Sequence, residues 1–194
     1  ASNLVAERIA RSALNELQNA LNRAFSGNDR MAATDAATLF YAVAVSAPFS
    51  DAVLSEAASA VIRAAVVVLS ERAHSRGPAF VSLEAASLDA AHSMVPALAW
   101  RASQGDGDAA KIVDGALQAA ALALDASISP PPEAVQRAGA WLVLAVAKRA
   151  RKAPALASLP DVAWNYTAST APRCRALVYR AAAAVLAPVP LVPL

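Results

Sequence analysis

The chain has 194 residues, of which 57% are hydrophobic and 16% are charged, and its net charge is +2. This length suffices for one well-buried core, and much of the apolar content is alanine, the strongest helix former. Soluble domains average about 25% charged residues, so we expect a small exposed surface. The net charge is too low for a protein that coats nucleic acid. A single cysteine, Cys174, excludes an intrachain disulfide.

Hydrophobic periodicity predicts an all-α fold of about seven or eight helices, since no stretch alternates in the way a strand does. The expected helices cover about residues 3–25, 33–47, 51–73, 82–103, 109–126, 130–153, 161–168 and 172–187.

Local signals mark several helix ends. Gly27 has the position that a left-handed C-terminal cap prefers, and the Gly-Asp-Gly-Asp turn at residues 105–108 supplies an N-terminal cap. Glu84 is expected in the first turn of its helix, where the helix dipole favours a carboxylate. Pro96 is expected to kink the same helix. The prolines at 130–132 are tolerated in a first turn, which has no hydrogen bond to lose.

Three segments share a loose pattern and predict repeated units. Residues 34–47, 88–102 and 137–150 each contain alanine, an aliphatic residue and alanine in succession. A second apolar helix follows each segment, which predicts three antiparallel helical hairpins behind an N-terminal helix, stacked as a short solenoid or an irregular bundle. We therefore expect one helical domain over residues 1–187 and an extended, proline-rich apolar tail over residues 188–194.

The first of these units resembles a known repeat class. Residues 35–64, "DAATLFYAVAVSAPFSDAVLSEAASAVIRA", are similar to one unit of the octatricopeptide or heptatricopeptide type, in which a polar start leads into a Leu-aromatic-Ala-aliphatic-Ala core and a second helix. The resemblance covers about a sixth of the chain. The second unit departs from the pattern at Pro96, and the third has Gly139 near its start. The resemblance implies a role in organelle RNA metabolism or in a mitochondrial ribosome.

Catalytic and metal-binding patterns are not found in the sequence. The two histidines, His74 and His92, lie 18 residues apart, and neither they nor Cys174 have the short spacing of a zinc site. The turn at residues 105–108 lacks the other ligands of a calcium loop. We therefore predict no enzyme activity, no cofactor and no small-molecule substrate. Uncharged apolar runs such as 64–69 and 115–124 fall short of the ~20 residues of a membrane span, so no span is predicted.

The C-terminal third carries the strongest functional signal. From residue 127 onward there are eight Lys and Arg residues against two acids, Glu133 and Asp161. Helical geometry places Trp141 on the same side of its helix as Arg137 and Lys148, while the middle of that helix is apolar in the other directions. The candidate RNA-binding residues are Arg137, Lys148, Arg149, Arg151, Lys152, Arg173 and Arg180. The alternative interpretation is that cations in a last helical turn only complement the helix dipole and maintain solubility.

Together these features predict a non-catalytic structural subunit of a large ribonucleoprotein assembly, an organellar (mitochondrial) ribosome, with protein neighbours and RNA as partners. The alternative is a scaffold of a multisubunit complex without RNA, favoured by the low charge and the apolar tail. Mitochondrial localisation follows from the resemblance, with a cytoplasmic location as the alternative. As a structural or scaffolding subunit the isolated chain is expected to self-associate or aggregate, whereas contact with RNA predicts binding that weakens steeply with salt.

Overall fold

The computed structural model describes residues 2–49, 51–125, 130–149 and 171–186, and the predicted all-α class is confirmed for them. The expected helix at 161–168 and the tail at 188–194 lie outside the described residues. The helices are α1 (Ser2–Gly27), α2 (Arg30–Ser46), α3 (Asp51–Ser70), α4 (Pro78–Ser103), α5 (Gly107–Leu124), α6 (Glu133–Arg149) and α8 (Pro172–Leu186), with two short 3-10 segments, η1 (Ala47–Phe49) and η2 (Ala73–Arg76).

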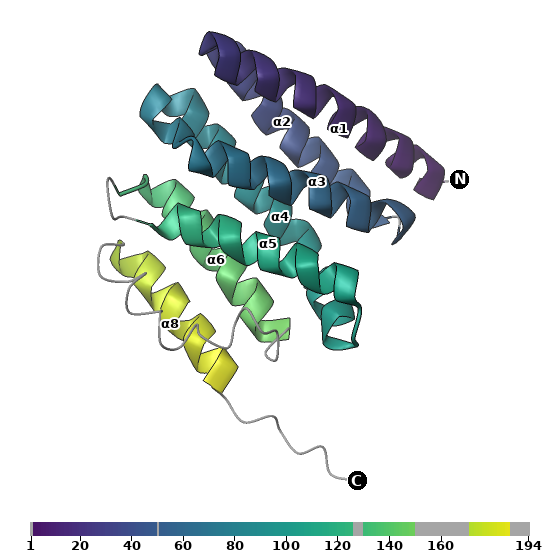
Figure 1. Cartoon of the computed structure of the whole chain (residues 1–194), viewed down its shortest axis with the longest axis vertical. Helices are drawn as coiled ribbons and strands as arrows, with labels where there is room; N and C mark the ends of the chain where they lie inside the picture. The colour runs from purple at the N-terminus through teal and green to yellow at the C-terminus, as the bar shows by residue number, and fades with distance from the viewer. Residues whose placement is uncertain (1, 50, 126–129, 150–170, 187–194) are drawn as a thin grey trace.

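The helices from α1 to α6 form two layers. In Figure 1, α1, α3 and α5 lie in front of α2, α4 and α6. Successive helices run antiparallel, and contacts link α2 to α4 and α4 to α6 within the rear layer and α3 to α5 within the front layer. The three segments that share the repeat pattern fall on α2, α4 and α6. The repeat therefore marks three neighbouring helices of one layer, as stacked repeats require.

The last described helix, α8, runs in the same direction as α6. The backbone N–H of Ala171, at the start of α8, donates to Oε1 of Gln136, near the start of α6, at 3.0 Å. Both helices consequently begin at the same end of the molecule, as Figure 1 shows. The helices α6 and α8 therefore do not form an antiparallel hairpin with each other. A hairpin needs a short connection, and 22 residues, 150–171, separate these two helices.

Helix ends confirm some of the sequence signals and correct others. Asp106 caps α5 as predicted, because its Oδ1 accepts from the N–H groups of Asp108 and Ala109. Asp29 caps α2 in the same way. The left-handed residue after α1 is Asn28, with φ 49°, and the prediction of Gly27 is wrong. An asparagine side chain tolerates this conformation better than most others do.

The fourth helix begins earlier than its periodicity predicts. Pro78 occupies the first turn of α4, where a missing N–H costs nothing, and Gly77 precedes it with φ 120°, which favours glycine. Glu84 consequently lies in the second turn of α4, and its prediction as a first-turn residue is wrong. The helix continues through Pro96.

Small residues allow the layers to approach closely. A Cβ added at Gly139 of α6 would lie 2.8 Å from Cβ of Ala123 and 3.3 Å from the backbone oxygen of Ala120, both on α5. This contact explains why glycine stands where the repeat pattern has a polar residue. The middle of α6, residues 142–147, is buried, as the sequence predicts.

One described helix has the length and composition of a membrane span. Residues Ala52–Ser70 have a mean hydropathy of 1.9, although short uncharged runs predict no span. Half of this stretch is buried inside the protein, where α3 packs against α4 and α5. This burial is consistent with a core helix.

Candidate nucleic-acid interface

Most exposed residues of α6 lie along one stripe of an otherwise buried helix. The stripe begins at Glu133 and Ala134, and Arg149, in the last turn, lies beside it. Arg137, Trp141, Lys148 and Arg149 are exposed, and Trp141 retains 43% of its surface. The spacing of four and seven residues places Arg137, Trp141 and Lys148 on one side. An indole between two cations suits a nucleic-acid strand, because bases stack on aromatic rings while phosphates pair with cations.

The neighbouring helix α4 exposes a stripe with a similar mixture of residue types. It carries Asp89, His92, Pro96 and Trp100, whose positions fall within about 80° of one another on a helical projection. Trp100 is 61% exposed. Among the remaining positions of α4 between residues 89 and 100, Ser93 and Ala97 are also exposed and the others are buried.

The stripe on α2 completes the surface. Thr34, Thr38, Tyr41 and Val45 are all exposed and follow each other at helical spacing. The Asp89 carboxylate of α4 lies close enough to the Tyr41 hydroxyl to raise its pKa, and the charge of Arg137 on α6 reaches the same carboxylate. The three stripes therefore share one surface.

We call this surface the rear face. Its members are Thr34, Thr38, Tyr41, Val45, Asp89, His92, Pro96, Trp100, Arg137, Trp141, Lys148 and Arg149.

Partial burial and neighbouring charges shift three titratable groups on the rear face. Burial raises the pKa of Tyr41, and the Asp89 carboxylate raises it further. Burial also raises the pKa of Asp89, against the lowering effect of His92 and Arg137. Burial lowers the pKa of His92; Asp89 opposes this shift and Arg149 adds to it. The face thus carries three Arg and Lys charges, the partly desolvated carboxylate of Asp89 and, at the start of the α6 stripe, the exposed carboxylate of Glu133.

The candidate RNA-binding residues do not form one cluster. Arg137, Lys148 and Arg149 share the rear face, whereas Arg151 and Lys152 lie outside the described residues. Because α8 runs parallel to α6, Arg173 lies level with the start of α6. Lys148 is twelve residues further along than Gln136, or about 18 Å at 1.5 Å per residue. The sequence leaves open whether the cations of the two helices adjoin; Arg173 lies level with Arg137 at the start of α6, away from Lys148 and Arg149 at its end. Arg180 is exposed about halfway along α6.

Sequence reasoning missed Tyr41, Asp89 and His92 as members of the candidate interface. Their spacing shows that Asp89 and His92 share a helix face with Trp100. The sequence does not show which face of α4 stays exposed, since that depends on how α2 and α6 flank it. The available signal was the repeat pattern itself, which places α2, α4 and α6 in equivalent positions.

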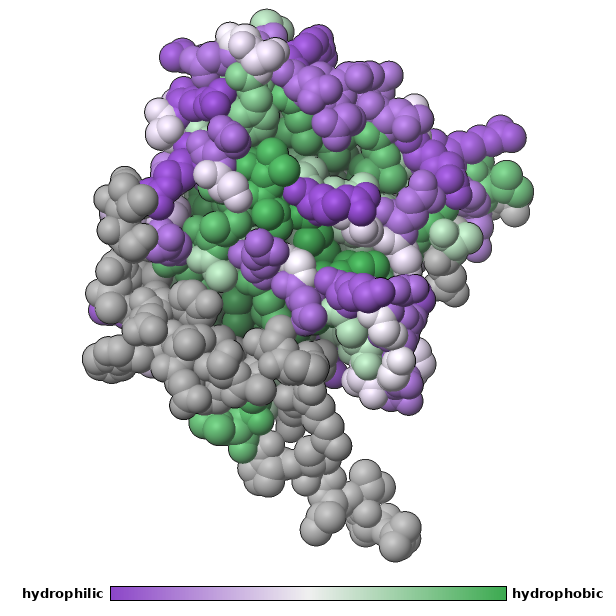
Figure 2. Space-filling view, in the orientation of Figure 1, coloured by the Kyte–Doolittle hydropathy of each residue, from purple (hydrophilic) through white to green (hydrophobic). Residues whose placement is uncertain are grey.

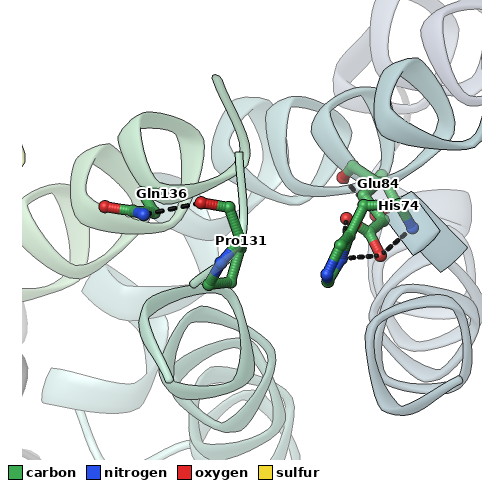
Figure 3. Close-up of polar contacts among 5 residues, drawn as sticks. His74, Glu84, Pro131 and Gln136 are labelled. Carbon is green, nitrogen blue, oxygen red and sulfur yellow. Dashed lines mark hydrogen bonds and ion pairs between the residues drawn. The ribbon is translucent and has the colours of Figure 1, made fainter. Parts of the chain in front are cut away.

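His74, in η2, takes part in a buried contact with Glu84 of α4. Glu84 is 0% exposed, and its carboxylate accepts from the backbone N–H of His74 at 2.9 Å and contacts Nδ1 of the same ring at 3.0 Å. Burial raises the pKa of Glu84, while the contacts with His74 lower it. Figure 3 shows this pair beside the start of α6. Every buried side-chain polar atom of the described residues has a hydrogen-bond partner, so the pair is a satisfied structural contact.

A second buried contact fixes the start of α6. The Gln136 side chain, 4% exposed, donates from Nε2 to the backbone oxygen of Pro131 at 2.6 Å (Figure 3) and accepts from Ala171. It therefore joins the proline segment, α6 and the beginning of α8. In the parts of the chain that the structure describes, no three His, Cys, Asp or Glu side chains gather as a metal site would require.

Comparison with known proteins leaves the candidate interface as the main source of functional information. No protein-family model, no curated protein and no solved structure matches the chain.

Proposed function

We propose that the chain is a non-catalytic structural subunit of a large ribonucleoprotein assembly, an organellar (mitochondrial) ribosome, and that it contacts RNA through its rear face. One observation supports this function above the others: Arg137, Lys148 and Arg149 share an exposed surface with Tyr41 and two exposed tryptophans. Phosphate contacts supply most of the affinity of such a surface, and stacking on aromatic rings adds to it.

The matching test neutralises the three cations of α6. We expect the triple variant Arg137→Gln, Lys148→Gln, Arg149→Gln to bind a labelled single-stranded RNA at least about tenfold more weakly at low salt. Each lost phosphate contact reduces the salt dependence of log K by about 0.7 for a single strand, so the slope should fall by about 2. Fluorescence anisotropy across a salt series measures both quantities.

A charge-matched control separates the rear face from the net charge. The triple variant Arg8→Gln, Arg23→Gln, Lys111→Gln removes the same number of exposed cations from α1 and α5. It should bind RNA like the unmodified chain. Equal losses in both variants would mean that the rear face has no special role, and no binding at low salt would exclude the proposed contact with RNA.

A scaffold of a protein complex without RNA is the second candidate function. It is favoured by the exposed apolar side chains at the start of α1, where Leu4, Val5 and Ile9 are each about half exposed or more. Purification of the complex from its native source, with protein and RNA partners both identified, distinguishes the two functions. Recovery of protein subunits without RNA would support the scaffold.

A further inference from the structure

The front layer contains a groove between α1 and α3 with a volume of about 720 Å³. Figure 2 shows hydrophobic surface exposed on this side of the molecule between rows of hydrophilic side chains. The volume lies in the range of sites that enclose a ligand or a short peptide segment. The apolar lining consists of Leu21, Phe25, Ala60, Ala64 and Val67.

Each wall of the groove is one helical stripe. Gln18, Leu21, Asn22 and Phe25 follow each other along α1, and Ala60, Arg63, Ala64 and Val67 follow each other along α3. The two alanines of α3 leave space where larger side chains would fill the gap between the helices. Val67 consequently remains 55% exposed, although it lies on a wall of the groove.

One end of the groove is held in a fixed shape by Arg76. Its guanidinium lies 4.9 Å from the centre of the Phe25 ring, donates to the Phe25 backbone oxygen at 3.1 Å and pairs with Glu71 at 3.6 Å. The aromatic wall is therefore preorganised. This geometry lowers the ordering cost of binding.

The groove also offers hydrogen-bond donors. Arg63 is exposed and makes no ion pair or hydrogen bond within the described part of the chain. Gln18 donates one hydrogen bond to Asn22, which leaves the Asn22 amide group available as a donor. Aromatic and apolar walls with side-chain donors are the features that recognise extended proline-rich segments, whose backbone carbonyls have no internal partners.

We propose that this groove binds residues 187–194 of a second copy of the chain. This segment, Ala-Pro-Val-Pro-Leu-Val-Pro-Leu, contains three prolines and no charged side chain, and it lies outside the described residues. Valine and leucine side chains fit the apolar walls, and the carbonyl groups beside the prolines accept hydrogen bonds from the donors. The inference does not depend on RNA binding.

Residues 187–194 are too short to reach and fill the groove of their own chain. The groove lies at the ends of α1 and α3, whereas α8 ends at the opposite end of the molecule (Figure 1). The end of α8 is therefore separated from the groove across the stack by at least two helix spacings of about 8–10 Å, and along the helix axes by about 22 Å, the length of the 15-residue α8, or about 27–30 Å in all. Eight residues extend over at most about 26–29 Å. All eight residues, 187–194, would be needed to span that distance, so none would be left to lie in the groove. A head-to-tail contact between copies follows, and such contacts build chains of subunits.

A peptide titration tests the contact. An acetylated, labelled peptide of residues 184–194 should bind the full chain in fluorescence anisotropy, and Val67→Glu should weaken binding at least about tenfold by placing a charge on the apolar wall. The matched control is Val45→Glu, which changes a similarly exposed valine of α2 on the rear face and should bind the peptide normally. Circular dichroism confirms that both variants are folded.

Sedimentation velocity tests the same contact between full chains. Concentration-dependent association should disappear in Leu191→Asp and in Val67→Glu and persist in Val45→Glu. Failure of the peptide to bind, equal binding by the two valine variants, or association that survives Leu191→Asp would each overturn the proposal. In those cases the occupant of the groove is a segment of another protein or none at all.

Discussion

Each of the two histidines lies beside a carboxylate, yet the two pairs have opposite environments. His74 and Glu84 are enclosed at the junction of the helices, where the carboxylate has no exposed surface. Asp89 and His92 lie on the rear face with Tyr41 and two arginines nearby. The same residue types therefore serve stability at the first site and remain available to a ligand at the second. Changes at the interior pair should alter the free energy of unfolding, and changes on the rear face should alter binding.

The largest expected effect is on the free energy of unfolding, from a change at the buried Glu84–His74 pair. Glu84→Ala removes the acceptor of the His74 N–H and leaves a cavity, so we expect a loss of about 3 kcal/mol in the free energy of unfolding. Glu84→Gln keeps an acceptor oxygen of the same shape and should cost about 1 kcal/mol. Urea denaturation followed by circular dichroism measures both losses.

The exposed carboxylate provides the matched control. Asp89→Ala should change the free energy of unfolding by less than about 0.5 kcal/mol, as exposed substitutions usually do. Equal losses for Glu84→Ala and Asp89→Ala would remove the distinction between the two pairs.

The next largest loss of unfolding free energy is expected at Gly139, where α5 and α6 are in close contact. Gly139→Ala would force its Cβ to within 2.8 Å of Ala123, and overpacking of this kind costs about 1–3 kcal/mol. Alanine returns up to about 1 kcal/mol in helix propensity, so we expect a net loss of about 1–2 kcal/mol by urea denaturation. Gly107→Ala, where an added Cβ meets nothing within 4 Å, should be neutral or slightly stabilising. A stable Gly139→Ala would show that the two helices can separate at little cost.

The sequence predicts features that depend on one helix and fails where several helices meet. The stripe of Arg137, Trp141 and Lys148 follows from the spacing within α6 alone, and the buried middle of that helix follows from its composition. The position of Glu84 could not be predicted, because the helix boundary is set by Pro78 and not by the apolar periodicity.

Contacts between distant segments escaped prediction for a related reason. Tyr41 and Asp89 meet only because α2 and α4 are neighbours in one layer, and no spacing along the chain encodes their register. The direction of α8 depends on the path between α6 and α8. Composition and periodicity say little about that path.

The smallest expected effect concerns pH and the rear face. Burial lowers the pKa of His92, so the folded state favours the neutral ring and the unfolded state binds the proton more readily, near the ordinary pKa of 6.5. The contribution of His92 to stability is consequently present above pH 6.5 and is lost as the pH falls below it. The effect should be smaller than the two losses above, because the ring is partly exposed and water screens its charge.

The measurement compares urea denaturation of the unmodified chain and of His92→Gln between about pH 8 and pH 5.5, because the difference between them cancels the other titrating groups. The raised pKa values of Glu84 and Asp89 act in the opposite direction, since their contribution is present at acidic pH and lost as the pH rises. We expect the unmodified chain to lose stability relative to His92→Gln as the pH falls. If the difference in unfolding free energy between the two proteins does not change with pH, His92 is fully solvated. Tyr41 and Asp89 would then be the partly desolvated titratable groups of the rear face.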